Sequence, residues 1–174
     1  FGLGKKPRDI VFCDEEKNTP IEEKGNIYGF LECMATYESA RKTGKRLFIL
    51  SRSGFAGIQR FSANWTGDIW SSWRHLKRSI PMLLGMGLSG LVFVGADIGG
   101  FAPFLKAKRR LFARWIELGT FYPFMRIHYM IYKPPQEPWT FGEEVLNISR
   151  KYIELRYRLI PYIYSLFWES HRTG

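Results

Sequence analysis

The sequence predicts an α/β fold in which parallel strands alternate with crossover helices. Short apolar segments typical of buried strands alternate along the chain with longer segments in which apolar residues recur at helical spacing. This order indicates a parallel sheet, because parallel neighbours must be joined by a long crossover connection, usually a helix. Apolar residues make up 45% of the 174 residues, which suffices for a core and excludes a disordered chain.

The first half of the chain predicts one helix and one buried strand between two irregular segments. Apolar residues recur at helical spacing between Ile27 and Tyr37, and Gly44 is a typical end for that helix. A continuous apolar run from Leu47 to Leu50 indicates a buried strand. The predicted elements are an extended polar segment at residues 1–24, a helix at 26–44, a strand at 46–51 and a long loop at 53–71.

The second half predicts two strands and three helices. Ser71 or Ser72 is placed to cap the first of these helices. Pro161 is expected to interrupt the last one, because proline lacks the amide donor of a helical residue. The predicted elements are a helix at residues 72–85, a strand at 91–96, a helix at 105–119, a short strand at 121–126, a loop at 133–139 and a mostly helical segment at 141–171.

The chain is strongly basic, with 26 Lys and Arg against 16 Asp and Glu and a net charge of +10. A basic protein can attract nucleic acid or an anionic membrane. The charge falls in short clusters, however, and no nucleic-acid-binding motif accompanies them. We therefore expect solvated helix faces and no nucleic-acid partner.

Three further features bound the function. The uncharged stretch 79–96 approaches the length of a membrane span, but Gly85 and its neighbouring glycines interrupt it, so we expect no span. Cys13 and Cys33 lack the spacing of a zinc site or a disulfide framework, and we expect two free thiols. Free thiols and the absence of an apolar leader before Arg8 slightly favour the cytoplasm.

Four polar residues, Arg52, Asp68, Asp97 and His128, each lie just after a predicted strand or within the loop that follows one. In α/β folds ligands bind at the carboxyl ends of parallel strands, so this placement predicts a site. Arg126, at the end of the last predicted strand, could neutralise or orient the two carboxylates.

Asp68 is the candidate general acid. Its loop, WTGD at residues 65–68, is aromatic and glycine-rich, and burial there would raise the pKa of the carboxyl group, as a general acid requires. The structural alternative is that Asp68 caps the helix that follows or orders the loop.

Asp97 lies in the glycine-rich loop GADIGGF at residues 95–101, where backbone can approach a ligand closely and the carboxylate could accept bonds from sugar hydroxyls. The alternative is a turn aspartate that bonds its own backbone. An aromatic wall for a sugar could be formed by Trp65, Phe101, Phe55, Trp70 and Trp73, although aromatic residues at this density more often belong to a core. His128 could bond a hydroxyl, although a lone histidine is more often structural.

Taken together, these motifs closely resemble glycoside hydrolase family 31, the family of α-glucosidases and α-xylosidases. The matching segments run in the family's order: NIYG at 26–29, LSRSGFAG at 50–57, WTGD at 65–68, WSSW at 70–73, GADIGGF at 95–101, FYPFMR at 121–126 with His128, QEPW at 136–139 and LRYRLIPY at 155–162.

The resemblance implies a retaining α-glycosidase built on a (β/α)8 barrel and acting on an α-glucoside or oligosaccharide. Asp68 would be the general acid/base. The subsite for the non-reducing sugar would be lined by Arg52, Trp65, Asp97, Phe101 and His128. No metal or organic cofactor is implied.

The sequence also departs from the family's pattern. The family's nucleophile is an Asp in a Trp-x-Asp-Met-Asn-Glu segment, which is absent here. The match covers the C-terminal half of the barrel, about four strand–helix units. We expect residues 1–25 to be an extended segment and 26–174 to be this partial catalytic domain. Ile127 stands where the family usually has Asn, and residues 106–110 are basic where it is usually acidic or polar.

Two expectations follow from these departures. The isolated chain should be inactive, and should need the remaining half of the barrel or self-association to cover its strand edges. The alternative function is a degenerate half-barrel that binds carbohydrate or assembles without catalysis.

Overall fold

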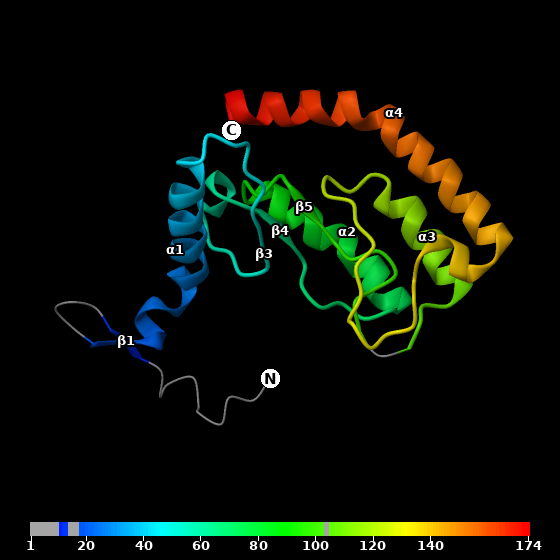
Figure 1. Cartoon of the computed structure of the whole chain (residues 1–174), viewed down its shortest axis with the longest axis horizontal. Helices are drawn as coiled ribbons and strands as arrows, with labels where there is room; N and C mark the ends of the chain where they lie inside the picture. The colour runs from blue at the N-terminus through cyan, green and yellow to red at the C-terminus, as the bar shows by residue number, and fades with distance from the viewer. Residues whose placement is uncertain (1–10, 14–17, 103–104) are drawn as a thin grey trace. The chain divides into compact units, whose positions relative to one another are not determined.

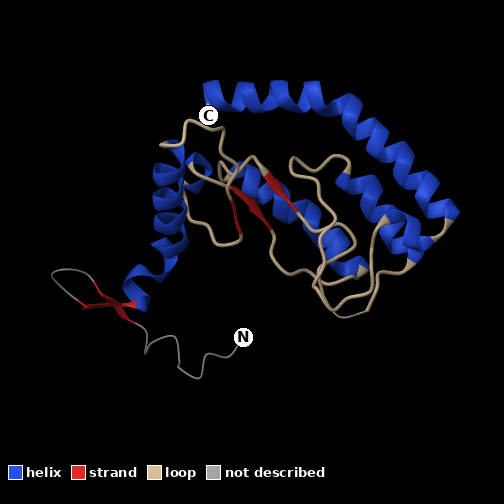
Figure 2. Ribbon diagram, in the orientation of Figure 1, coloured by secondary structure: helices blue, strands red, loops and turns tan. Residues whose placement is uncertain are grey.

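The structure is a computed structural model that describes residues 11–13, 18–102 and 105–174. Most of the predicted extended segment at 1–24 lies outside the described residues. The chain divides into two compact units, residues 1–62 and 63–174, and each is described by itself. The element order is given in Figure 1 and the helices and strands are distinguished in Figure 2.

The first unit opens with a small antiparallel pair, β1 (Val11–Cys13) and β2 (Asn18–Pro20), in which Val11 pairs with Pro20. Helix α1 (Ile21–Arg41) follows directly. The helix is confirmed, but the prediction that residues 21–24 are extended is wrong. Two glutamates lie in the first turn of α1, where the helix dipole favours negative charge.

Strand β3 (Leu50–Ser51) is much shorter than the strand predicted at 46–51. Farther along the chain, the ring of Phe61 packs against two rings of α1, Phe30 at 5.4 Å and Tyr37 at 5.6 Å between centroids. Gly29 of α1 lies against Ser53, and a Cβ at Gly29 would come within 2.7 Å of the Cβ of Ser53. The apolar face of α1 therefore holds the chain that follows β3.

The second unit contains two parallel strands, β4 (Ala63–Trp65) and β5 (Val94–Gly95), joined by helix α2 (Trp73–Leu88). In their register Asn64 lies beside Val94 and Trp65 beside Gly95. The parallel pairing is confirmed, but β4 falls inside the segment predicted as a loop. Ser72 caps α2, since its side chain accepts a bond from the amide of His75 at 3.2 Å.

Residues 121–126 do not form the predicted strand. The segment still runs beside β5, because the amide of Phe124 donates to Val94 O at 2.9 Å and that of Ile98 to Arg126 O at 3.1 Å. Pro123 lacks an amide and cannot complete a ladder. The carbonyl of Phe124 lies directly against Gly95, where a side chain would not fit.

Two helices complete the unit, α3 (Arg109–Gly119) and α4 (Glu143–Thr173). A short 3-10 helix, η3 (Pro138–Phe141), lies between them in the chain. The predicted interruption of α4 at Pro161 is wrong, because the helix is continuous through that residue. Figure 1 shows that α4 instead bends along its length, as expected where a proline removes one backbone hydrogen bond.

The core of the second unit lies where α3 packs beneath the loop that follows β5. Ile98, Phe112, Trp115 and Ile116 are fully buried there. The ring of Phe112 stacks on that of Phe141 from η3, with centroids 4.2 Å apart. No helix among the described residues combines the length and the apolar character needed to cross a membrane.

Candidate active site

The centre of the site is Asp97, whose side chain is completely buried after β5. Its Oδ1 accepts a hydrogen bond from Nε of Arg126 at 3.1 Å. Burial raises the pKa of Asp97 to about 6, against the opposing effect of the Arg126 charge. The negative charge of Asp68 raises it further. Asp97 is therefore a buried acid whose ionisation depends on its close cationic partner, Arg126, and on the charge of Lys133.

Three polar atoms around this pair have no hydrogen-bond partner among the described residues: Oδ2 of Asp97, Nη2 of Arg126 and Nε1 of Trp65. They belong together, because the guanidinium of Arg126 lies over the Trp65 ring at 4.9 Å. A buried polar atom without a partner is costly, and a hydroxylated ligand could satisfy all three. The group offers one acceptor and two donors beside an aromatic face.

Phe101 and His128 form the second pair of the site. Their rings stack, with centroids 5.4 Å apart and planes inclined by 23°. Partial burial and the charge of Arg126 lower the pKa of His128, while the charge of Asp68 raises it. The structure thus brings together Phe101 and His128, two of the residues that the sequence motifs single out.

Asp68 is exposed, so the expectation that its loop buries the carboxyl group is wrong. The neighbouring Gly67 and Ile69 are both buried. Asp68 lies at a bend directly after Gly67, which has a φ of 78°, and its side chain is turned toward solvent. It is nevertheless near the site, since its charge acts on both Asp97 and His128.

Arg52 lies in the first unit, directly after β3, and is exposed. Its predicted place after a strand is confirmed. The other candidates all lie in the second unit.

Lys133 and Gln136 are two buried residues of the site that the sequence analysis missed. The ammonium of Lys133 donates to Ser71 Oγ at 2.5 Å and to the carbonyl of Gly100 at 2.8 Å. Gln136 donates from Nε2 to the same carbonyl at 3.1 Å, and its Oε1 accepts from the amide of Ala107 at 3.0 Å. A lysine in a proline-rich segment carries no periodic signal that predicts burial.

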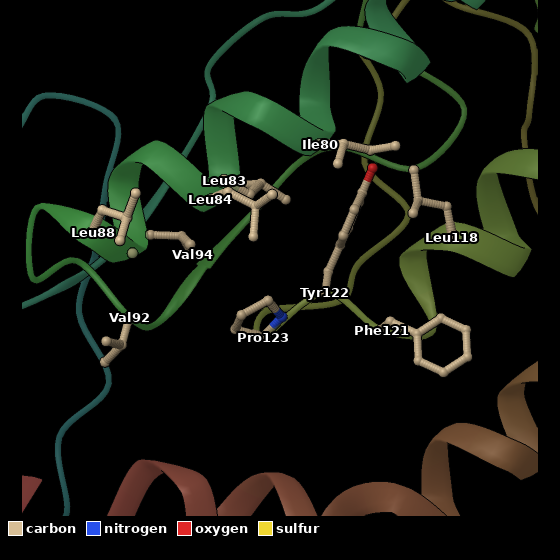
Figure 3. Close-up of a pocket in the computed structure, with 11 residues that line it drawn as sticks. Ile80, Leu83, Leu84, Leu88, Val92, Val94, Leu118, Phe121, Tyr122 and Pro123 are labelled. Atoms are coloured by element: carbon tan, nitrogen blue, oxygen red, sulfur yellow. The ribbon is translucent and has the colours of Figure 1, made fainter. Parts of the chain in front are cut away.

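An apolar cavity of about 630 Å³ lies elsewhere in the second unit, between α2, β5 and residues 118–123. Figure 3 shows the side chains around it, among them Leu83, Val94 and Phe121. None of its lining residues is charged, and none is a candidate site residue. It is unsuited to acid/base chemistry. Within the described part of the chain, no three His, Cys, Asp or Glu side chains gather as metal ligands would.

Comparison with known proteins gives one consistent result. Residues 4–166 match the family described as the glycosyl hydrolases family 31 TIM-barrel domain. The chain is 49% identical over 173 residues to "Alpha-glucosidase 2" of Bacillus thermoamyloliquefaciens, covering 97% of this chain and 22% of that protein. It is 47% identical over 150 residues to "Lysosomal alpha-glucosidase" of Rattus norvegicus, covering 86% and 16%.

Solved structures agree. The Tris-bound glucosidase II alpha subunit matches with a TM-score of 0.82 and 41% identity, over 88% of this chain and 17% of that one. The family 31 alpha-glucosidase from Bacteroides thetaiotaomicron matches with a TM-score of 0.81 and 46% identity, over 94% and 28%.

The chain spans about a fifth of the length of the curated relatives it matches, which share its barrel segment and extend well beyond it. Its α/β elements, its parallel strands and its sequence agree on one assignment: the chain belongs to glycosyl hydrolase family 31 and is part of that family's TIM-barrel domain.

Proposed function

We propose that the full-length protein carrying this chain is a retaining glycoside hydrolase that cleaves terminal α-glucosidic bonds, with Asp68 as its general acid/base. Relatives that match nearly the whole chain are named α-glucosidases, which supports this activity. The structural observation that carries the proposal is the buried Asp97–Arg126 pair, which presents unpartnered polar atoms beside Trp65.

In this proposal the chain supplies the C-terminal half of a (β/α)8 barrel, with residues 26–174 in the catalytic domain. The nucleophile is a carboxylate in the other half. Retaining glycosidases hold their two carboxyl groups about 5–5.5 Å apart. Arg52 and the nucleophile would face the sugar together with the residues of the second unit.

The sugar subsite is assigned to residues that lie around Asp97. Ionised Asp97 accepts bonds from sugar hydroxyls through Oδ2, while Arg126 and Trp65 donate to sugar oxygens. The stacked rings of Phe101 and His128 line the other side, and His128 bonds a further hydroxyl. Burial of Asp97 makes each of these bonds stronger than it would be in water.

Asp68 protonates the leaving oxygen while the nucleophile attacks the anomeric carbon to form a glycosyl-enzyme. It then takes a proton from the water that releases the sugar.

The test is Asp68→Asn in the full-length protein. We expect kcat/KM for maltose to fall about 10²- to 10⁴-fold, the usual contribution of general acid/base catalysis. Azide should restore turnover of 4-nitrophenyl α-glucoside, because it attacks the glycosyl-enzyme without needing a base. Glu154→Asn removes an exposed carboxyl group on α4 and should leave the rate unchanged. Unchanged activity in Asp68→Asn would remove the role given to this residue.

The same experiment separates the second candidate function. A wild-type protein that binds maltose in calorimetric titration but turns over neither substrate would be the degenerate carbohydrate-binding half-barrel. Ile127, in place of the family's usual Asn beside His128, is the feature that favours this alternative.

A further inference from the structure

Lys133 is a buried cation that the proposed chemistry does not use. Its side chain is only 4% exposed. The ammonium donates to Ser71 Oγ at 2.5 Å, to Gly100 O at 2.8 Å and to Phe101 O at 3.5 Å. Three donors and three acceptors match one to one, so the bonding capacity of the ammonium is filled.

These acceptors belong to two different loops. Ser71 ends the loop that begins at β4 and carries Asp68, and its own Oγ donates to Gly99 O at 2.5 Å. Gly100 and Phe101 belong to the loop that follows β5 and carries Asp97. Lys133 comes from a third segment, the proline-rich loop after His128, and joins the other two.

Backbone bonds between the two loops transmit this link to the residues beside Asp68. The amides of Phe101 and Ala102 both donate to Ile69 O, at 2.8 and 3.0 Å, and the amide of Ser71 donates to Ala102 O at 2.7 Å. Ile69 is bonded directly to Asp68 in the chain. A shift of the Gly100–Phe101 backbone would therefore move Asp68 relative to Asp97.

Stability alone is a poor explanation for this residue. The three hydrogen bonds described above all go to neutral oxygens, and burial lowers the pKa of Lys133 to about 8, with the charge of Asp97 opposing the shift. Burying an ammonium without a bonded carboxylate is costly. A neutral side chain of the same length would avoid that cost but could not fix three oxygens at once.

We propose that Lys133 is a positioning residue, which holds the loop of Asp68 against the loop of Asp97 and so sets where the proton donor stands relative to the bound sugar. The inference rests on the proposed function, since it assigns Lys133 a role in the reaction assigned to Asp68.

The test compares two substrates of the full-length protein, maltose and 4-nitrophenyl α-glucoside. Maltose has a poor leaving group that must be protonated as it departs, whereas 4-nitrophenolate leaves without a proton. Displacing Asp68 should therefore slow cleavage of maltose far more than cleavage of the nitrophenyl glucoside. The ratio kcat/KM reports this first step for both.

For Lys133→Met we expect kcat/KM for maltose to fall about 30- to 100-fold, as for a misplacement of roughly 1 Å at a catalytic group. The loss for 4-nitrophenyl α-glucoside should be about tenfold smaller. Lys77→Met, which removes an exposed lysine on α2, should change neither value. An equal loss on both substrates, or no loss, would overturn the proposal, because a purely structural role cannot distinguish leaving groups.

Ser71→Ala is the second variant and decides the matter if Lys133→Met does not fold. It removes one acceptor of Lys133 but keeps the charge, and should show the same preference for loss on maltose at a smaller size. An equal loss on both substrates, or none, again overturns the positioning role. Failure of the proposed function looks different: the wild-type protein would cleave neither substrate, or Asp68→Asn would keep its activity on maltose.

Discussion

Arg126 donates from Nε to Oδ1 of Asp97 at 3.1 Å, across 29 positions of sequence. The contact follows from the fold, because residues 124–127 run beside the segment that carries Asp97 and bond it at Val94 and Ile98. The two side chains differ in exposure, since Asp97 is fully buried and Arg126 is 24% exposed. Arg126 thus places a positive charge beside a buried carboxylate.

Arg126→Met should destabilise the protein, because it leaves the buried carboxyl group of Asp97 without its cation. Removing one partner of a buried pair costs about 3–5 kcal/mol, and the partial exposure of Arg126 places the expected loss near the lower figure. The measurement is the unfolding transition of the full-length variant by calorimetry. Arg150→Met, on an exposed turn of α4, is the matched control and should have little effect. Equal stability of the two variants would contradict the importance of the pair.

Asp97 should make stability fall as pH rises through the weakly acidic range. Its pKa is raised from 3.8 to about 6, so between these values the folded protein binds more protons at this site than the unfolded chain does. The stabilisation is complete below about pH 3.8 and is lost as the pH rises through 6, a change of about 3 kcal/mol.

The measurement is the difference in stability between the wild-type protein and Asp97→Asn from pH 4 to 7. Asparagine does not titrate, so the wild-type protein should lose stability relative to the variant over this range. Effects of other acidic groups cancel in the comparison. A difference that stays constant with pH would show that Asp97 is not buried as described.

Sequence patterns predicted the long elements well and the short ones poorly. Helical periodicity located α1, α2, α3 and α4 with ends that differ from the observed ones by at most five residues. Strand β4 has only three residues, too few for alternation to show, and it lies among glycines and serines typical of loops. Residues 121–126 are apolar enough for a strand, but Pro123 removes an amide that a strand needs.

The same limit applies to the site. The residues identified from motifs and from their place after strands form two sets of contacts in the structure. Arg126 contacts both Asp97 and Trp65, and Phe101 contacts His128. Burial of single residues could not be predicted, because it depends on packing between segments far apart in sequence. Composition therefore suggested a buried Asp68 and gave no sign of a buried Lys133. In the structure Asp68 is exposed and Lys133 is buried.

Gly100→Ala should be strongly destabilising. Gly100 has a φ of 80°, and a Cβ there would lie 2.5 Å from the backbone nitrogen of Ser71. Both the left-handed conformation and the contact oppose any side chain, with an expected loss of roughly 2–3 kcal/mol. The control is Gly85→Ala in α2, where a Cβ meets nothing within 4 Å. That change should stabilise the helix by about 0.5–1 kcal/mol.

Thermal unfolding of the two alanine variants, measured side by side, tests whether the Asp68 and Asp97 loops pack as closely as described. A Gly100→Ala protein as stable as the wild type would mean that the loops can separate without cost. The link through Lys133 would then lack the rigid contact on which it depends.

Lys133 should make stability rise with pH on the alkaline side, opposite in sign to Asp97. Burial lowers its pKa from 10.5 to about 8, so between these values the unfolded chain binds more protons at this site than the folded protein. The folded state is fully stabilised by this difference in proton binding above about pH 10.5, and the stabilisation is lost as the pH falls through 8.

The measurement is the free energy of unfolding of the wild-type protein and of Lys133→Met between about pH 8 and 10.5. The wild-type protein should gain about 3 kcal/mol relative to the variant as the pH rises across this range. The exposed Lys77→Met control should track the wild type throughout. A constant difference between wild type and Lys133→Met would mean that the ammonium is solvated, and that charging it costs the fold nothing.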